Sequence, residues 1–275
     1  MSIMKRISAI TGISMLLAAC AGTQGSTAND TTMPTDLLQA TQETKTITVG
    51  TEGTYRPYSY TDERGNLVGI EVDIMKLLAK DLGAEVNFTV APWDGLIAGV
   101  DAGKYPVVIN NLAINDERKK KYDFSIPYTR DVAKFAVRDD SPLRTIDDLT
   151  PQLKAAQSST SNLGMTAKDI YGLGIVPVDG FVQAVDLVTS GRADVTLNSL
   201  ATFKLYQEEN DASQIRLLDG EVATPDCCSI LVEKGQDEFV TALNEAIERR
   251  LADGSIAEIT RKYVGEDMSA KVSAQ

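Results

Sequence analysis

The chain has 275 residues, of which 43% are hydrophobic and 24% charged, which is enough apolar material for one large or two smaller globular domains. Lysine and arginine number 27 against 39 acidic residues, and this net charge of −12 argues against nucleic acid as a partner. Histidine is absent, which excludes Ser-His-Asp and Cys-His catalysis and removes the commonest metal ligand. No cofactor and no metal site is therefore expected.

The N-terminus has the pattern of an export signal. Lys5 and Arg6 precede an uncharged stretch, 7–19, that is shorter than the roughly 20 residues of a membrane-spanning helix. We therefore predict a signal peptide over residues 1–19. Its end, Leu17-Ala18-Ala19-Cys20, resembles the lipobox of bacterial lipoproteins, which implies that Cys20 is lipidated and becomes the mature N-terminus. The alternative is a plain signal peptide followed by an incidental cysteine.

Residues 20–45 follow as a predicted lipidated N-terminus and flexible tether. The segment from Ala21 to Lys45 is rich in Thr, Ser, Gly, Gln and Asp and has no periodic apolar pattern. Folded structure is expected to begin near Thr46. The protein would then be exported and held on a lipid bilayer, either in a periplasm or on the outer face of the cytoplasmic membrane.

From Thr46 onward, short β-branched runs alternate with helical patterns. Strands are predicted at 47–49, 85–90 and 107–109, with helices at 69–82 and 93–102. This βαβαβ order predicts a parallel sheet with ligand chemistry at the carboxyl ends of its strands. The polar pair Asn110-Asn111 lies at one such end.

A second unit repeats this order. Strands are predicted at 154–157, 175–178, 194–198 and 215–218, and helices at 147–149, 161–171, 181–190 and 200–209. The tail returns to a strand at 229–232, and helices follow at 237–253 and 255–263. We predict two α/β lobes, lobe 1 from residues 46–130 and 227–275 and lobe 2 from residues 131–226, joined by two crossings. A small ligand would bind in the cleft between them.

Four ordered motifs carry a family resemblance. They are GTEGTYRPYSY (50–60), GNLVGIEVDI (65–74), WDGLIAGVDAGKY (93–105) and DERKKKYDFSIPY (116–128). Over about residues 46–265 the chain resembles the polar amino-acid solute-binding proteins of ABC importers. The resemblance implies a monomeric, two-lobed periplasmic-binding-protein fold of type II, each lobe a mostly parallel sheet flanked by helices. It also implies a function: to capture a free amino acid by lobe closure and deliver it to a membrane permease.

The segment QSSTSN (157–162), together with the segment around Arg118, most resembles the cystine- and cysteine-binding branch of this family. Cystine or another polar amino acid is therefore the expected ligand. Gln157, at the start of this segment, is expected to contact it.

The ligand's carboxylate is expected to bind Arg118, whose guanidinium can donate two parallel hydrogen bonds to it. Family position implies this role, whereas the charge run 118–121 alone favours a solvated arginine. Thr160 and Ser161 match further carboxylate contacts, and the alternative for them is simple helix capping. Ala113 departs from the Ser or Thr of many members, so only its backbone can contribute.

The ligand's ammonium is expected to bind Glu52, at the family's acidic position after the first strand. The second family acid is replaced by Ser199. One anion should then remain, assisted by neutral acceptors from Asn198, Ser199 or the carbonyl of Asn111. Tyr55 and Trp93 match the aromatic walls around the ligand side chain, although core packing is the alternative for Trp93.

Cys227 and Cys228 are adjacent, and without histidine they cannot complete a tetrahedral metal site. A disulfide between neighbours would be strained, so free thiols are predicted.

Two other functions stay open. One is an exported dehydratase of the cyclohexadienyl-dehydratase type on the same fold, which needs a placed proton donor. The other is a sensory receptor domain acting through a partner.

Overall fold

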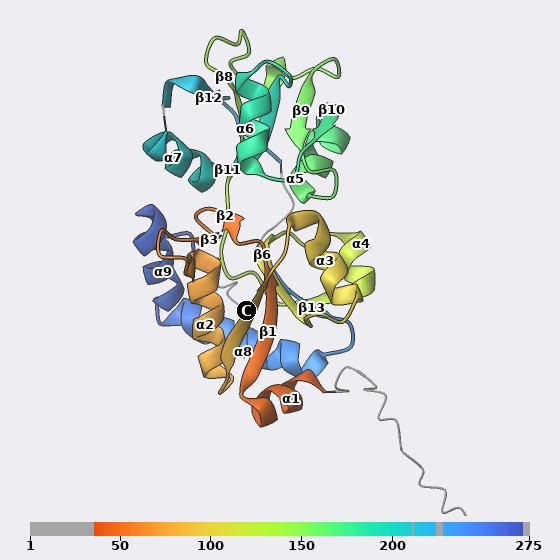
Figure 1. The fold of residues 1–275 in the computed structure, drawn as a ribbon, viewed down its shortest axis with the longest axis vertical. Coiled ribbons are helices and arrows are strands. Elements are labelled where there is room, and N and C mark those ends of the chain that lie inside the picture. Colours follow the sequence, from red (N-terminus) through yellow and green to blue (C-terminus); the bar gives the residue numbers. More distant parts are fainter. Residues whose placement is uncertain (1–35, 211, 224–227, 272–275) are drawn as a thin grey trace, which may run out of the picture. The chain divides into compact units, whose positions relative to one another are not determined.

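The computed structural model describes residues 36–210, 212–223 and 228–271. A first mixed sheet has the strand order β5-β1-β6-β13-β7. Figure 1 labels β1, β6 and β13 of this sheet. Its strands are β1 (Thr46–Thr51), β5 (Glu85–Val90), β6 (Val107–Leu112), β7 (Tyr122–Phe124) and β13 (Ser229–Glu233). β1 pairs in parallel with β5 and β6, whereas β13 is antiparallel to both of its neighbours. Their β-branched residues suit the half-buried positions of a pleated sheet.

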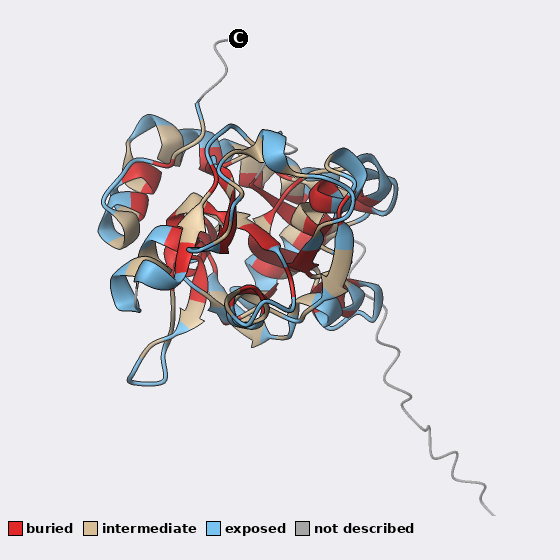
Figure 2. Cartoon of the chain, turned by 90° about the horizontal axis from the view of Figure 1, so that it is seen from above, coloured by how far each residue is buried: buried red, intermediate tan, exposed pale blue. Residues whose placement is uncertain are grey.

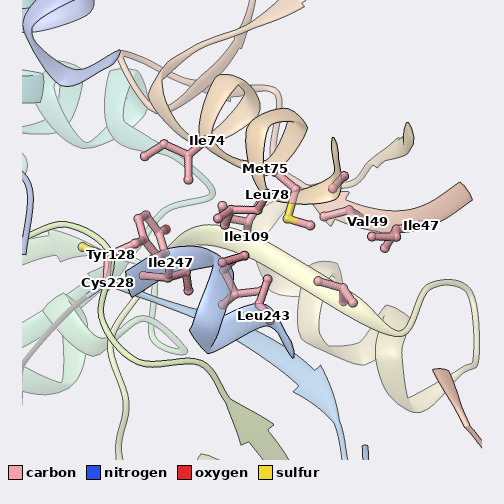
Figure 3. Close-up of a cluster of buried hydrophobic side chains, with 14 of the residues drawn as sticks. Ile47, Val49, Ile74, Met75, Leu78, Ile109, Tyr128, Cys228, Leu243 and Ile247 are labelled. Carbon is pink, nitrogen blue, oxygen red and sulfur yellow. The ribbon is translucent and has the colours of Figure 1, made fainter. Parts of the chain in front are cut away.

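Helices cover both faces of this sheet. They are α2 (Ile70–Asp81), α3 (Trp93–Asp101), α4 (Asp116–Lys121), α8 (Asp237–Ala252) and α9 (Ser255–Val264). In α2 the apolar residues Ile74, Met75 and Leu78 recur at helical spacing and are fully buried. Figure 3 shows them against β1 and β6, with Leu243 and Ile247 of α8 in the same cluster. The largest hydrophobic cluster therefore lies beneath the strand ends that carry polar residues.

A second sheet has the order β10-β9-β11-β8-β12. Its elements are β8 (Ala133–Arg138), η1 (Ile146–Asp148), β9 (Lys154–Gln157), α5 (Asn162–Met165), η2 (Thr166–Ile170), β10 (Gly174–Pro177), α6 (Phe181–Thr189), β11 (Val195–Ser199), α7 (Leu200–Glu209), η3 (Ala212–Gln214) and β12 (Ile215–Leu217). β9, β10 and β11 run in parallel, and β8 is antiparallel to β11 and β12. Each sheet is therefore mostly parallel, as predicted.

The chain passes between the two sheets twice, once from β7 to β8 and once from β12 to β13. In Figure 2 the buried residues gather on the strands and on the inner faces of the helices, whereas the outer helix faces are exposed. Each sheet has its own hydrophobic cluster. The described residues thus form two α/β lobes linked by two connections. They include no helix with the length and hydrophobicity to cross a bilayer.

The structure corrects the predicted tether. Residues 37–44 form the helix α1 (Leu37–Thr44), whose first turn is capped by the Asp36 carboxylate, which accepts from two backbone N–H groups. Leu37 is buried in the first hydrophobic cluster. Folded structure is therefore already present about ten residues before Thr46. Residues 1–35, with the predicted signal peptide and Cys20, lie outside the described residues.

Two local differences follow from short elements. A small antiparallel sheet of β2 (Thr54–Tyr55), β3 (Ser59–Thr61) and β4 (Leu67–Val68) was not predicted, because strands of two or three residues show no periodicity. The predicted helix 161–171 is α5 followed by the π-helical turn η2. Ser161 caps it by accepting from the Gly164 N–H at 2.9 Å.

Candidate functional site

A cavity of about 120 Å³ lies between the two sheets, at the carboxyl ends of parallel strands. This is where ligand chemistry was expected. Nine of the predicted site residues line it, namely Glu52, Tyr55, Trp93, Asn111, Ala113, Gln157, Ser161, Asn198 and Ser199. Both lobes contribute to this set.

Glu52 follows β1 and is held by neutral groups. Its carboxylate accepts from Thr54 Oγ1 at 3.0 Å and from Asn110 Nδ2 at 3.2 Å. Asn110 Oδ1 in turn accepts from the Glu52 N–H at 2.8 Å, which fixes the turn after the strand. Burial raises the pKa of Glu52.

A second carboxylate, Asp131, also lines the cavity. Its Oδ2 accepts from the Tyr58 hydroxyl at 2.7 Å and from Asn111 Nδ2 at 2.9 Å, and its Oδ1 accepts from Ser199 Oγ at 2.9 Å. Burial raises the pKa of Asp131. The expectation of one anion in the cleft is therefore wrong. Residue 199 is a neutral serine, but its hydroxyl donates to the carboxylate of Asp131, which lies on the first crossing between the lobes.

Asn111 joins this carboxylate to the core. It has a left-handed backbone with φ of 50°, which is uncommon outside glycine. Its N–H donates to Glu71 Oε1 at 2.6 Å, and the Tyr128 hydroxyl donates to the same oxygen. Glu71 is fully buried, and burial raises its pKa to about 7. A buried acid beneath the cavity thus holds a cavity residue in an unusual conformation.

Arg118 lies beside the cavity rather than in its lining. Its side chain is 7% exposed, and its guanidinium donates to the carbonyls of Ala113 at 3.0 Å and Thr160 at 3.3 Å. Burial lowers its pKa to about 10, and no carboxylate of the described residues pairs with it. Lys119, Lys120 and Lys121 are exposed. The arginine is thus distinguished from its neighbours, and the alternative of a solvated arginine does not hold.

Thr160 likewise lies outside the cavity lining, on an adjoining groove with Arg118. Its hydroxyl donates to Asp94 Oδ1 at 2.6 Å and accepts from Trp93 Nε1 at 3.0 Å. Ser158 Oγ donates to the same Asp94 oxygen at 2.9 Å. Direct hydrogen bonds therefore connect α3 of the first lobe to the loop after β9 of the second, at the edge of the cavity.

Further hydrogen bonds close other sides of the cavity. The Tyr55 hydroxyl donates to Asn198 Oδ1 at 2.7 Å, and Asn162 Nδ2 donates to the Ala113 carbonyl at 3.1 Å. Gln157 directs its amide into its own sheet, where it donates to the Leu197 carbonyl at 2.6 Å. Gln157 thus lines the cavity while also stabilising the second sheet.

Several cavity residues were not among the predicted ligand contacts: Asn110, Asp131, Ala133, Ser158, Asn162, Leu163, Val178, Gly180, Phe181, Ala184 and Thr196. Phe181 begins α6 and adds an aromatic wall from the second lobe. The signals that could have found Asp131 are its acidity and its place directly before β8, in the predicted first crossing.

The prediction of free thiols is wrong for Cys228, which is buried and disulfide-bonded. The other two cysteines, Cys20 and Cys227, lie outside the described residues. Exported proteins fold in an oxidising compartment, where thiols pair.

Comparison with known proteins places these features in context. Residues 47–266 match the family described as bacterial extracellular solute-binding proteins, family 3. A probable amino-acid ABC transporter-binding protein of Haemophilus influenzae is 33% identical over 85% of this chain and 90% of its own length. The L-cystine-binding protein TcyJ of Escherichia coli is 32% identical over 85% of this chain and 88% of its own.

Solved structures share the fold. The L-cystine solute receptor of Neisseria gonorrhoeae, in its unliganded open conformation, is 35% identical with a TM-score of 0.60, over 85% of this chain and 99% of that one. The ancestral amino acid-binding protein AncCDT-1, a precursor of cyclohexadienyl dehydratase, is 28% identical with a TM-score of 0.74, over 82% and 99%. The two-lobed fold of the type II binding proteins is thereby confirmed.

Proposed function

Because the chain belongs to the bacterial extracellular solute-binding proteins of family 3, we propose that it captures a free amino acid between its lobes and delivers it to the permease of an ABC importer. The observation that carries the proposal is the cavity at the strand ends, which is lined by carboxylates and amides of both lobes. Among the described residues that line it there is no lysine or arginine. This lining complements a ligand that brings its own positive charge.

Arg118 supports an amino-acid ligand from the side of the carboxylate. A buried guanidinium costs free energy unless its donors are satisfied, and this one contacts two neutral carbonyls beside the cavity. A carboxylate is the stronger partner, because it pairs with the guanidinium in both charge and planar geometry. We assign the ligand's α-carboxylate to Arg118, with Ala113, Thr160 and Ser161 beside it. Closure of the lobes would complete this contact.

Cystine, or another polar amino acid, is the ligand class that we propose. Two of the proteins compared above are named for L-cystine. The walls contributed by Tyr55, Trp93 and Phe181 provide apolar surface for a side chain, and the carboxylates and amides provide polar contacts. The relatives compared above are named as binding proteins and not as enzymes.

A thermal-shift screen of the twenty amino acids and L-cystine tests the proposal. A ligand at 100 times its dissociation constant adds about 2.7 kcal/mol to the free energy of unfolding, which raises the Tm of a domain of this size by about 5–10 °C. One or a few polar amino acids should give such a shift. If none does, and a prephenate-like acid is instead converted to product, the dehydratase alternative replaces this proposal.

The family is extracellular, and we propose that this member is held on a membrane by acyl chains on Cys20. Support comes from the sequence Leu17-Ala18-Ala19-Cys20 alone. Cys20→Ala should move the protein from the membrane to the soluble fraction and leave ligand affinity unchanged, because the described residues that line the cavity begin only at Glu52. A variant that stays on membranes after a salt wash would refute the anchor.

We also propose that the protein acts as a monomer, which sedimentation analysis can test.

A further inference from the structure

We propose that Asp131, on the first crossing between the lobes, is the carboxylate that binds the ligand's α-ammonium group. The assignment rests on the proposed function, since it presupposes an amino-acid ligand in the cavity. It replaces Glu52 in that role and leaves Glu52 to contact the ligand's side chain.

The surroundings of Asp131 hold its carboxylate in place without neutralising its charge. The three side-chain donors, Tyr58, Asn111 and Ser199, are all neutral and come from both lobes. No lysine or arginine of the described residues forms an ion pair with Asp131 or lines the cavity around it. A carboxylate removed from water without a cation is costly, and burial accordingly raises its pKa. An ammonium group entering the cavity would supply the missing charge.

The hydrogen bonds around Asp131 can rearrange to accept a donor from the ligand's ammonium group. The hydroxyls of Tyr58 and Ser199 lie 2.6 Å apart, so either one can donate to the other. If Ser199 turns its hydrogen toward Tyr58, a lone pair on Asp131 Oδ1 becomes free. The ammonium can then donate to Oδ1 while Tyr58 and Asn111 keep their bonds to Oδ2. Ser199 thus serves as an adjustable donor that yields its place to the ligand.

Glu52 has a different environment. Its two oxygens are each bonded to a neutral donor of its own lobe, Thr54 and Asn110. The acids Asp94 and Asp179 also act on it electrostatically. Glu52 therefore belongs to the part of the cavity near α3 and α6, whereas Asp131 lies where Tyr58, Asn111 and Ser199 converge. A ligand anchored at Asp131 would direct its side chain toward Glu52.

The structure also provides a charge-relocation variant. Ser199 Oγ lies 2.9 Å from Asp131 Oδ1 and caps α7 by accepting from the N–H of Ala201 at 3.1 Å. Aspartate caps helices as well as serine does. Asp131→Ser combined with Ser199→Asp therefore moves the carboxylate by about one hydrogen-bond length and preserves the helix cap.

Calorimetric titration with L-cystine, and with the amino acid that gives the largest shift in the thermal screen, tests the assignment. Asp131→Asn should weaken binding by about 30-fold or more, because it removes one member of a buried charged pair. The double variant should recover most of this loss. Asp147→Asn, which removes an exposed acid outside the cavity lining, is the matched control and should change affinity little.

A second readout separates ligand binding from a structural effect. An analogue of the same amino acid that lacks the α-ammonium group should bind the wild type much more weakly than the amino acid does. Asp131→Asn should reduce that difference to a few-fold. Glu52→Gln should instead change the order of preference among amino acids.

The outcomes separate the two proposals. If the wild type binds no amino acid, the proposed function fails and this assignment fails with it. If the wild type binds one and Asp131→Asn keeps full affinity and full discrimination against the analogue, the assignment alone is refuted.

Discussion

Replacing Glu71 with glutamine should make the protein's stability less dependent on pH. Burial raises the pKa of Glu71 from 4.5 to about 7, and its Oε2 has no hydrogen-bond partner among the described residues. Between these pH values the folded state keeps a proton that the unfolded state has lost. The free energy of unfolding therefore falls as pH rises through this window, and Glu71 contributes about 3 kcal/mol of that fall at 1.4 kcal/mol per pKa unit.

Glutamine has the shape of the protonated acid and does not titrate. Urea unfolding of the wild type and Glu71→Gln, from pH 4.5 to 8, should show the variant gaining about 3 kcal/mol relative to the wild type across the series. Burial also raises the pKa of Glu52 and Asp131, and the part due to their own burial is common to both proteins, so that part cancels in the difference. Glu63→Gln, at an exposed position, is the control and should run parallel to the wild type. A constant difference between wild type and Glu71→Gln would refute the reasoning.

Three further predictions concern the rim and the packing. Arg118→Ala should weaken binding of every accepted amino acid by about 30-fold or more in calorimetry, whereas Lys120→Ala, which breaks an exposed ion pair, should leave affinity unchanged. Asp94→Ala, which removes two hydrogen bonds between the lobes, should speed ligand dissociation about tenfold in stopped-flow measurements, and an unchanged rate would contradict a role in closure. Gly99→Ala should lower the free energy of unfolding by about 1–3 kcal/mol, because a Cβ there would clash with the hydroxyl of Tyr105. Gly95→Ala in the same helix is the control: its Cβ would meet open space, so it should not destabilise the protein.

Most of the fold follows from periodicity. The predicted helix 69–82 agrees with α2, because its buried residues recur at helical spacing over three turns. Alternation of strands and helices likewise predicts two mostly parallel sheets. The segment 37–44 was predicted as a tether because it is largely polar. Its helix depends on packing of Leu37 against a distant part of the chain, and composition does not show that contact.

The candidate site, like the fold, could be predicted from the sequence only in part. Residues within the four motifs, such as Glu52 and Trp93, could be assigned to the cleft because the resemblance fixes their order along the chain. Asp131 lies in a connection without periodicity, and its proximity to Ser199 arises from the pairing of β8 with β11, in which Ser199 lies opposite Ala133. Arg118 was expected in the cleft, yet its guanidinium contacts carbonyls beside the cavity, which depends on the positions of both lobes. Strand pairing and contacts between segments far apart in the chain are thus the part that the sequence alone does not predict.

The position of Trp93 has a practical consequence for spectroscopy. It is the chain's only tryptophan, it lines the cavity, and its indole N–H donates to Thr160 of the other lobe at 3.0 Å. The Arg118 guanidinium lies 5.8 Å from the centre of its ring. Separation of the lobes would break that hydrogen bond and expose the indole to water, which shifts its emission to longer wavelengths. Because each molecule contributes one indole, unlabelled protein can report its own opening and closing in real time.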